Sequence, residues 1–374
     1  MSDKPVRGKR TVTIVDVAEK AGVSVATASR ALSGRGYASA EVKERVRQAS
    51  RQLNYRLNAA ARTLKVNRTH TIGLIITDII NPFYAYLADG VLNCARQLGY
   101  QVVLCATEED PEMEREAIKV LLEQRVDGII AVPTGKSNRM WREVLDMETR
   151  LVLVDREIPG LPQTDLVLVD NVKGAYLATK YLLELGHRRI GLIRGPIETT
   201  TGRERVQGYV EAYREAGITI DSDLIQGDTF FRESGYSAMN KLLSLPQCPT
   251  AVFATNNVLG EAAILSIREH GLHIPQDISF LMFDDVSWAV LFEPAITVVR
   301  QPTNSLGIMS LKLLDQRLKE AEMEEAHPPV RAVLEPEIIK RSSCLPLSIA
   351  EATDSSPMIY PSSQTDKSQI NPLV

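Results

Sequence analysis

The sequence predicts a small all-α headpiece at the N-terminus, followed by a two-lobed α/β core built on parallel sheets. Charge is the first observation: residues 1–70 carry 15 Lys and Arg against 5 Asp and Glu, whereas the remainder carries 28 against 42. The second is a series of short helical patterns between Thr13 and Leu57. The third is a change at Thr71, after which apolar runs alternate with helical stretches. Parallel sheets covered by helices on both faces produce that alternation.

Each of the three helices expected in the headpiece has its own start signal. Thr13 stands at the cap of the first helix, with Asp16 at capping-box spacing as its partner. Ser24 begins the second helix, and the third runs from Ser39 to Leu53. The apolar positions of the third helix recur at helical spacing: Val42, Val46, Ala49 and Leu53.

The stretch V-A-E-K-A-G-V-S-V-A-T-A-S-R-A-L at 17–32 is poor in large side chains, and Gly22 breaks it once. Two short helices joined by a glycine turn, within a basic unit, are typical of a helix-turn-helix that binds DNA. Small side chains let the two helices cross closely, so the second helix can enter the major groove. The expected contacts between them involve Ala18, Ala21, Val23, Ala28 and Leu32.

The core has more strand-like runs than one compact sheet holds, so we predict two α/β lobes. The runs are 71–78, 101–107, 128–132, 150–156, 166–170, 189–195, 250–255, 278–285 and 297–302. Helices are expected over 83–98, 111–124, 173–186, 203–217, 256–270 and 303–320.

Composition excludes several classes of protein. No apolar run approaches the ~20 residues that span a bilayer, and the basic N-terminus lacks the apolar region of a signal peptide. The four cysteines are scattered, without metal-ligand spacing, which indicates reduced thiols in a cytoplasmic protein without a metal site. No nucleophile and base set or phosphate loop is recognisable, so an enzyme is not expected.

The motif D-V-A-x-x-A-G-V-S-x-x-T-x-S-R, within residues 13–34, resembles the headpiece of LacI/GalR transcription regulators. That resemblance implies that Val25 and Ala26 read bases, with Arg30 one turn further on. Arginine forms bidentate hydrogen bonds to guanine, whereas valine and alanine offer only apolar contact to a thymine methyl group. The expected DNA-binding residues of the headpiece are Thr13, Ser24, Val25, Ala26, Thr27, Ser29 and Arg30.

Residues 58–67, N-A-A-A-R-T-L-K-V-N, resemble the hinge helix of that family. The resemblance implies that Leu64 wedges between base pairs in the minor groove while Arg62 and Lys65 meet the backbone. An ordinary alanine-rich linker helix is the alternative. The family usually has a proline just before this helix, but here Asn58 is the capping residue, so the hinge is expected to order less readily.

The core resembles the periplasmic sugar-binding fold, in which a ligand lies between two lobes at the carboxyl ends of strands. Polar groups at these positions are suited to sugar hydroxyls, and aromatic faces are suited to a sugar ring. The set resembles that of ribose-binding proteins, with Tyr84 as the chief difference. The expected ligand residues are Asn81, Phe83, Tyr84, Asp155, Arg156, Asn171, Arg205, Phe230, Asn256, Asp284 and Gln301.

These observations predict a homodimeric repressor that binds a pseudo-palindromic double-stranded operator and is released by a small sugar, with a pentose such as ribose favoured. No cofactor is expected besides this effector. The alternatives are a regulator that responds to a purine corepressor or another metabolite, and a sugar-binding transport protein. A phosphorylated partner protein as co-regulator remains open. The predicted domains are a headpiece (1–57), a hinge helix (58–67), a sugar-binding and dimerisation core (68–345) and a disordered tail (346–374).

Overall fold

A computed structural model describes residues 12–33, 37–53, 55, 68–135, 139–161, 164–323 and 327–347. The chain divides into two compact units, Met1–Thr69 and His70–Val374. The predicted hinge helix, with Asn58, Arg62, Leu64 and Lys65, lies outside the described residues, and so do residues 348–374 of the predicted tail.

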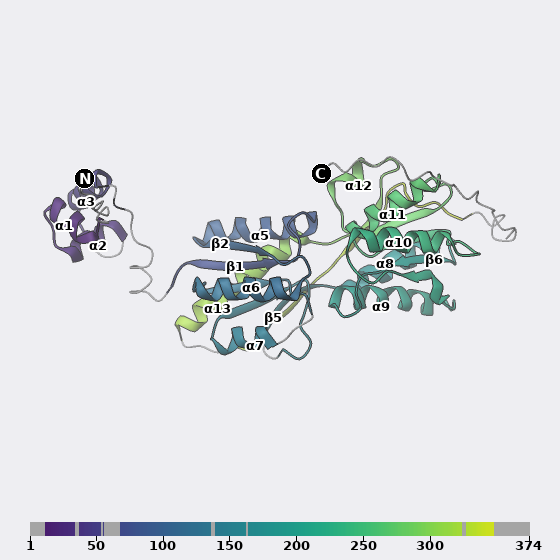
Figure 1. The fold of residues 1–374 in the computed structure, drawn as a ribbon, viewed down its shortest axis with the longest axis horizontal. Helices are drawn as coiled ribbons and strands as arrows, with labels where there is room; N and C mark the ends of the chain where they lie inside the picture. The colour runs from purple at the N-terminus through teal and green to yellow at the C-terminus, as the bar shows by residue number, and fades with distance from the viewer. Residues whose placement is uncertain are drawn as a thin grey trace, which may run out of the picture. The chain divides into compact units, whose positions relative to one another are not determined.

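The first unit contains the three predicted headpiece helices: α1 (Ile14–Ala21), α2 (Val25–Ser33) and α3 (Ala40–Gln52) (Figure 1). Gly22 ends α1 in the left-handed conformation, with φ at 63°, which glycine adopts without a steric penalty. The core between the helices consists almost entirely of small side chains, as the sequence predicts, while Val23 and Leu32 are only partly buried. Its buried members are Val17, Ala18, Ala21, Ala28, Ala31, Val46 and Ala49.

The second unit contains two lobes, each built on a six-stranded sheet, which confirms the predicted two-lobed core (Figure 1). The first sheet has the order β11-β5-β4-β3-β1-β2, and all of its strand pairs are parallel. Its strands are β1 (Thr71–Ile76), β2 (Gln101–Ala106), β3 (Gly128–Ala131), β4 (Arg150–Val154), β5 (Asp165–Val169) and β11 (Arg331–Leu334). Its helices are α5 (Pro82–Leu98), α6 (Pro111–Glu123), α7 (Arg139–Asp146) and α13 (Thr303–Glu322).

The second sheet has the order β12-β10-β9-β8-β6-β7. Its strands are β6 (Ile190–Ile193), β7 (Ile225–Gln226), β8 (Ala251–Ala254), β9 (Ser279–Phe283), β10 (Thr297–Arg300) and β12 (Glu337–Ile339). Its helices are α8 (Asn171–Glu184), α9 (Thr200–Glu215), α10 (Arg232–Leu243), α11 (Asn257–Glu269) and α12 (Ser287–Leu291), with a 3-10 turn at Ser222–Leu224.

The sheets are parallel, as predicted, except at one edge of the second sheet, where β12 pairs antiparallel with β10. The chain passes between the lobes after β5, after β10 and between β11 and β12. The last passage brings β12 to the sheet from the opposite direction. The strands β11 and β12 are short edge strands whose residues are exposed or half-buried, so they show no continuous apolar run that could be recognised.

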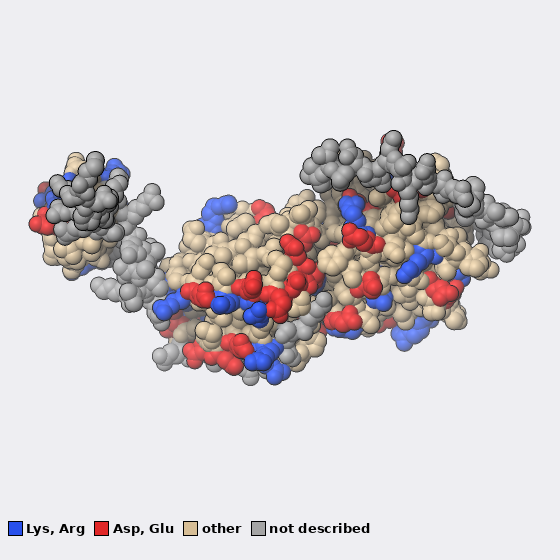
Figure 2. Space-filling model, viewed as in Figure 1, with Lys and Arg blue, Asp and Glu red and all other residues tan. Residues whose placement is uncertain are grey.

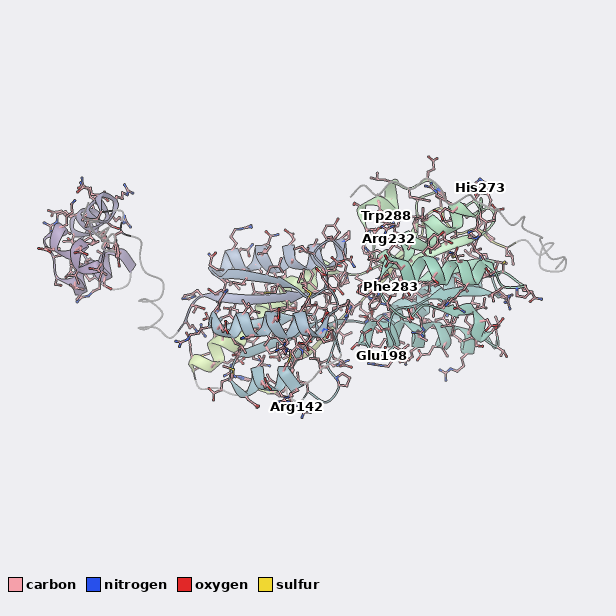
Figure 3. The ribbon with its side chains drawn as sticks, in the orientation of Figure 1. Arg142, Glu198, Arg232, His273, Phe283 and Trp288 are labelled. Atoms are coloured by element: carbon pink, nitrogen blue, oxygen red, sulfur yellow. The ribbon has the colours of Figure 1, made fainter. Side chains whose placement is uncertain are left out.

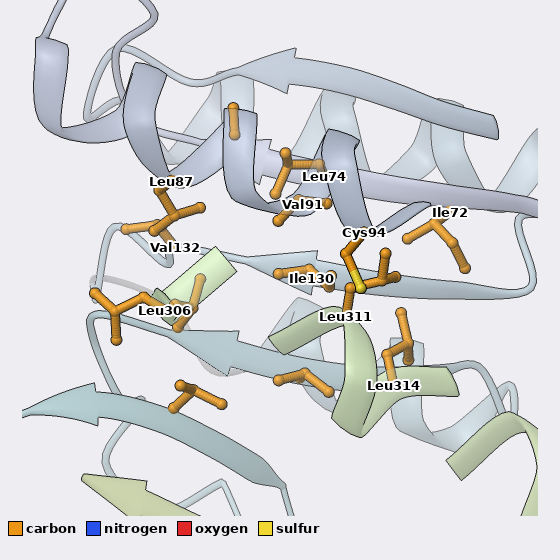
Figure 4. Close-up of a cluster of buried hydrophobic side chains, with 14 of the residues drawn as sticks. Ile72, Leu74, Leu87, Val91, Cys94, Ile130, Val132, Leu306, Leu311 and Leu314 are labelled. Carbon is orange, nitrogen blue, oxygen red and sulfur yellow. The ribbon is translucent and has the colours of Figure 1, made fainter. Parts of the chain in front are cut away.

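Helices cover both faces of each sheet. In the first lobe, α5 and α13 bury Leu87, Val91, Leu311 and Leu314 against the strands (Figure 4). These two helices cross at glycines: a Cβ atom on Gly307 would lie 2.1 Å from the Leu87 carbonyl oxygen. The close crossing holds the start of α5 beside the strand ends, where the polar residues of the core gather.

Candidate functional site

Two of the residues predicted to contact DNA also cap helices of the headpiece. The Ser24 hydroxyl accepts a hydrogen bond from the Thr27 N–H at 3.1 Å. Thr13 donates both its backbone N–H and its hydroxyl to the Asp16 carboxylate, each at 2.7 Å. Such caps fix where each helix begins and therefore which residues its outer face presents.

The helix α2 has one buried face and one exposed face. Ala28 and Ala31 are buried in the headpiece core. Val25, Ala26 and Arg30 are exposed on the other side, at the positions that the sequence assigns to base reading. The half-buried positions between the faces are Thr27 and Ser29. The exposed face of α2 therefore presents two small apolar side chains at the start of the helix and a guanidinium group one turn further on.

A cavity of about 370 Å³ lies between the two lobes of the core, at the carboxyl ends of strands from both sheets. Its size is in the range of small-molecule sites. Ten of the eleven predicted ligand residues line this cavity: Asn81, Phe83, Tyr84, Asp155, Arg156, Arg205, Phe230, Asn256, Asp284 and Gln301.

Each lobe places one aspartate in the cavity, and the local backbone geometry is the same in both lobes. Asp155 directly follows β4 and Asp284 directly follows β9, and both adopt the left-handed conformation, with φ at 68° and 77°. The N–H of each donates to a neighbouring strand, to the Val167 oxygen at 3.0 Å and to the Val299 oxygen at 2.9 Å. Strained backbone of this kind is found where a side chain must be held in one direction for function.

Aromatic rings form apolar walls around these charges. Phe83 and Tyr84, at the start of α5, pack edge to face with their centroids 5.0 Å apart. From the second lobe, Phe230 lies under the Arg156 guanidinium, 5.2 Å from its ring centroid. The ring fits there because residue 195 is glycine: a Cβ atom on Gly195 would lie 2.1 Å from the Phe230 ring.

Arg156 is held by groups of its own lobe. Its two terminal amino groups donate to the Glu109 carboxylate at 2.6 and 2.7 Å, and one of them also donates to the Tyr84 hydroxyl at 3.0 Å. Burial alone would lower the pKa of Arg156, but Tyr84, Glu109 and Asp155 around it hold that pKa above its ordinary value. The guanidinium is therefore a permanent charge in the cavity wall.

Arg205 is positioned by Asn171, which is the predicted ligand residue that does not line the cavity. Arg205 Nε donates to Asn171 Oδ1 at 2.9 Å, and Nη1 donates to the Thr255 carbonyl oxygen at 2.5 Å. The guanidinium lies 3.9 Å from the centroid of the Phe283 ring, at the edge of the second lobe that faces the first (Figure 3). Asn171 therefore positions Arg205 and does not itself line the cavity.

The Asn256–Asn257 pair divides its roles differently from the expectation. Asn256 lines the cavity, but its side-chain oxygen caps α11 by accepting from the Leu259 N–H at 2.8 Å. Asn257 instead donates from Nδ2 to Asn81 Oδ1 at 3.0 Å, and so joins the two lobes. The sequence cannot distinguish the roles of two adjacent asparagines that follow one strand, because these roles depend on the direction in which each side chain points.

Several buried polar atoms around the cavity have no hydrogen-bond partner within the chain. Asp155 Oδ1, Arg156 Nε, Thr201 Oγ1 and Gln301 Oε1 all belong to residues that line it. Buried polar atoms are nearly always paired in folded proteins, and leaving one unpaired costs free energy. These atoms are therefore available to form hydrogen bonds with a ligand in the cavity.

Part of the cavity wall consists of residues that were not predicted from the sequence. Glu109 and Glu108 follow β2, and Thr77 and Asp78 follow β1, so the rule that polar strand ends form the site applies to them as well. The other lining residues that were missed are Ile79, Ile80, Ala106, Thr201, Phe231 and Val258. Except for Ala106, which ends β2, they lie on loops and helix starts, where no periodic signal exists.

The Asp155 carboxyl is expected to make effector binding depend on pH. Burial raises its pKa to about 6, although Arg156 and Arg205 oppose the shift. Between its ordinary value near 4 and 6, the empty folded protein loses stability as the pH rises, because the unfolded carboxyl releases its proton first. A ligand that donates hydrogen bonds to the carboxylate favours the ionised form, so its affinity should rise with pH through 6.

We expect effector affinity to rise by up to about fivefold between pH 5 and 6 and to level off above pH 7. Isothermal titration calorimetry at pH 5, 6, 7 and 8 measures the profile, and Asp155→Asn should flatten it. Asp277→Asn, outside the cavity, should leave it unchanged. An unaltered profile in Asp155→Asn would show that another group titrates.

Among the described residues, no group of three or more His, Cys, Asp and Glu side chains is arranged to hold a metal ion. None of the helices in that part of the chain is long and apolar enough to cross a membrane.

Comparisons with known proteins agree with both halves of this description. Residues 13–58 match the family described as "Bacterial regulatory proteins, lacI family", and residues 69–333 match "Periplasmic binding proteins and sugar binding domain of LacI family". The chain belongs to the LacI family. It is therefore a DNA-binding transcriptional repressor rather than an enzyme or a transport protein, which confirms the resemblance seen in the sequence.

Curated relatives and solved structures of LacI-family proteins cover nearly the whole chain. The HTH-type transcriptional repressor PurR of Pasteurella multocida is 38% identical over 335 residues, which are 88% of this chain and 98% of the relative. The transcriptional regulator CelR–cellobiose complex has a TM-score of 0.68 and 32% identity, over 89% of this chain and 99% of the other. The Lac repressor dimer bound to operator and the anti-inducer ONPF has a TM-score of 0.77 and 26% identity, over 90% and 100%.

Proposed function

We propose that this LacI-family repressor is a cytoplasmic homodimer whose operator binding is relieved by a small neutral polyol, with a pentose such as ribose as the first candidate. The observation that carries the proposal is the pairing of buried carboxylates and guanidinium groups within one cavity. Asp155, Arg205 and Asp284 are each at most 5% exposed there. Because every sugar hydroxyl both donates and accepts, such a mixed set can pair with several hydroxyl groups at once.

The detailed wall supports a compact ligand with a flat apolar face. Gln301 donates from Nε2 to Asp284 Oδ1 at 2.6 Å, which leaves Gln301 Oε1 unpaired toward the cavity. Phe83 and Phe230 approach from opposite lobes, and a sugar ring presents C–H groups to such aromatic faces. A ligand in this position touches both lobes, so its binding stabilises one arrangement of the two lobes over another. A change in that arrangement can be coupled to DNA binding.

A purine is the second candidate, and the names of the curated relatives favour it over the sugar. The relative from Pasteurella multocida is named PurR and spans almost the same length of chain. The cavity also has groups for a purine, since Arg156 Nε and Arg205 are donors for its ring nitrogens and oxygen, and Phe230 is a stacking surface. The carboxylates Asp155 and Asp284 disfavour the electron-rich edges of a purine, which is why the polyol is preferred here.

A thermal-shift screen of the full chain separates the two candidates. Ribose, xylose, glucose, cellobiose, hypoxanthine and guanine are tested singly, because a ligand at 100 times its Kd adds about 2.7 kcal/mol to the free energy of unfolding. Fluorescence anisotropy with operator DNA then gives the sign of the coupling. A pentose that raises the melting temperature and releases DNA supports the proposal. A purine that raises it and tightens DNA binding, with no response to pentoses, establishes the second candidate.

A further inference from the structure

The cavity contains two buried arginines, which are groups that could bind an anion, but acidic side chains outnumber them in its wall. Among the described lining residues, Arg156 and Arg205 face five carboxylates: Asp78, Glu108, Glu109, Asp155 and Asp284. Acidic side chains also gather on the surface where α6 begins, beside the second lobe (Figure 2). A phosphate group entering this space would meet like charges before it met a guanidinium.

Glu109 occupies the edge of Arg156 that a phosphate would use. Its carboxylate oxygens accept from Nη1 at 2.7 Å and from Nη2 at 2.6 Å. The Tyr84 hydroxyl lies 3.0 Å from Nη2, and the Pro133 oxygen lies 3.4 Å from Nη1. Only Nε of Arg156 is left without a hydrogen-bond partner, and the nearest charge that pairs with it is Asp155 Oδ2 at 3.7 Å. One N–H serves a single hydroxyl oxygen, whereas phosphate recognition by arginine is typically bidentate.

The backbone is strained in a way that places Glu109 there. Glu108 and Glu109 both have positive φ, at 50° and 60°, between a Thr107 oxygen and an Asp110 N–H that lie 2.8 Å apart. Turns with two such central residues are normally formed by asparagine and glycine. Two glutamates persist in this conformation only because their surroundings hold them, and such strain is concentrated at functional positions.

Arg205 does not offer a phosphate group the bidentate edge that Glu109 occupies on Arg156. Its Nε and Nη1 are taken by Asn171 and by the Thr255 oxygen, and its plane lies against the Phe283 ring. The carboxylates of Asp155 and Asp284 are the charges that act on it most strongly. Its remaining donors therefore face a region that two carboxylates already neutralise.

We propose that Glu109 is a specificity residue that makes the cavity select uncharged effectors and reject their phosphorylated forms, by occupying the bidentate edge of Arg156. This inference rests on the proposed effector site between the lobes, but it does not depend on whether the effector is a pentose or a purine. Removing the Glu109 charge while keeping its shape should turn the site into one that accepts phosphate.

The test uses the full chain as wild type, Glu109→Gln and the matched control Glu112→Gln, which removes an exposed charge three residues away on α6. The ligands are ribose, ribose 5-phosphate, guanosine, guanosine 5′-monophosphate and inorganic phosphate, in calorimetry at constant ionic strength. We expect the wild type to bind the uncharged member of its preferred pair at least 100-fold more tightly than the phosphorylated member. Glu109→Gln should bind the phosphorylated form or inorganic phosphate at least tenfold more tightly than wild type, and Glu112→Gln should not.

Other variants keep the outcome decisive. Glu109→Asn is the replacement variant if Glu109→Gln does not fold, because asparagine tolerates the left-handed backbone. The double variant Glu109→Gln/Arg156→Gln should lose the phosphate binding that Glu109→Gln gains. If the wild type binds neither sugar nor purine, the proposed function fails, while the inorganic phosphate comparison still decides the role of Glu109. Equal binding of charged and uncharged forms by the wild type, or no gain in Glu109→Gln and Glu109→Asn, would overturn the inference.

Discussion

Replacing Arg30 with alanine is expected to abolish selective binding of the operator, while weaker, salt-dependent binding to random DNA persists. The exposed face of α2 presents Val25 and Ala26 beside Arg30, and these two small apolar residues donate no side-chain hydrogen bonds. Hydrogen-bonded selection of bases by this helix is therefore expected to depend mainly on Arg30. A good bidentate contact discriminates between bases by about 1–3 kcal/mol, and a dimer on a palindrome makes the contact twice.

The measurement compares the operator, selected from randomised DNA with the wild-type protein, with a scrambled duplex of equal length. Fluorescence anisotropy at several salt concentrations gives the affinity and its salt dependence for each. Arg47→Ala is the matched control, because Arg47 is an exposed arginine on α3 and its loss removes the same charge from the headpiece. Retained selectivity in Arg30→Ala, or an equal loss in Arg47→Ala, would remove Arg30 from base reading.

Asp284→Asn is expected to leave operator binding intact and to remove most of the response to the effector. The Asp284 side chain is buried at the carboxyl end of β9, where it accepts from Gln301 Nε2 at 2.6 Å and from the Asn257 N–H at 3.2 Å. Loss of the Asp284 charge is expected to weaken the hydrogen bond to a ligand. It also removes one of the negative charges that balance the positive charge of Arg205. Charge-assisted hydrogen bonds contribute about 1.5–3 kcal/mol, so effector affinity should fall roughly 10- to 150-fold.

The neighbouring residue provides a control for that experiment. Asp285 pairs with Arg300 at 2.7 Å and with Arg341 at 2.7 Å, outside the cavity. Asp285→Asn should therefore lower the melting temperature without lowering effector affinity once the protein is folded. Calorimetry and operator release are measured for both variants, and normal release by effector in Asp284→Asn would show that the cavity is not the effector site.

Much of the molecule follows from residue patterns alone. Alternating apolar and helical stretches predicted two lobes with helix-covered sheets, because a strand buried on both faces must be apolar throughout. The resemblance to the periplasmic sugar-binding fold, in which groups at the carboxyl ends of such strands converge, led to eleven predicted residues, and ten of them line one cavity. Small side chains in the headpiece likewise predicted close helix crossing, and Ala18, Ala21 and Ala28 are buried there.

Short or irregular elements escaped the same reasoning. Helix α12 has five residues and strand β12 has three, too few to show a period. Helix α10 (Arg232–Leu243) carries Gly235 and several polar residues near its start, so its apolar face was not recognised. Its burial depends on packing against α11, which no local pattern records.

The sequence by itself determined which residues stand at the ends of buried strands, because hydrophobic patterning decides where a strand begins and ends. Only the tertiary structure decided what each of those residues touches. Asn256 caps a helix while Asn257 joins the lobes, and Asn171 holds Arg205 instead of lining the cavity. Glu109 follows a strand in the sequence, but its role could not be read there, because that role comes from a strained turn and from Arg156, 47 residues further along the chain. Contacts between distant residues depend on side-chain direction, which local sequence does not encode.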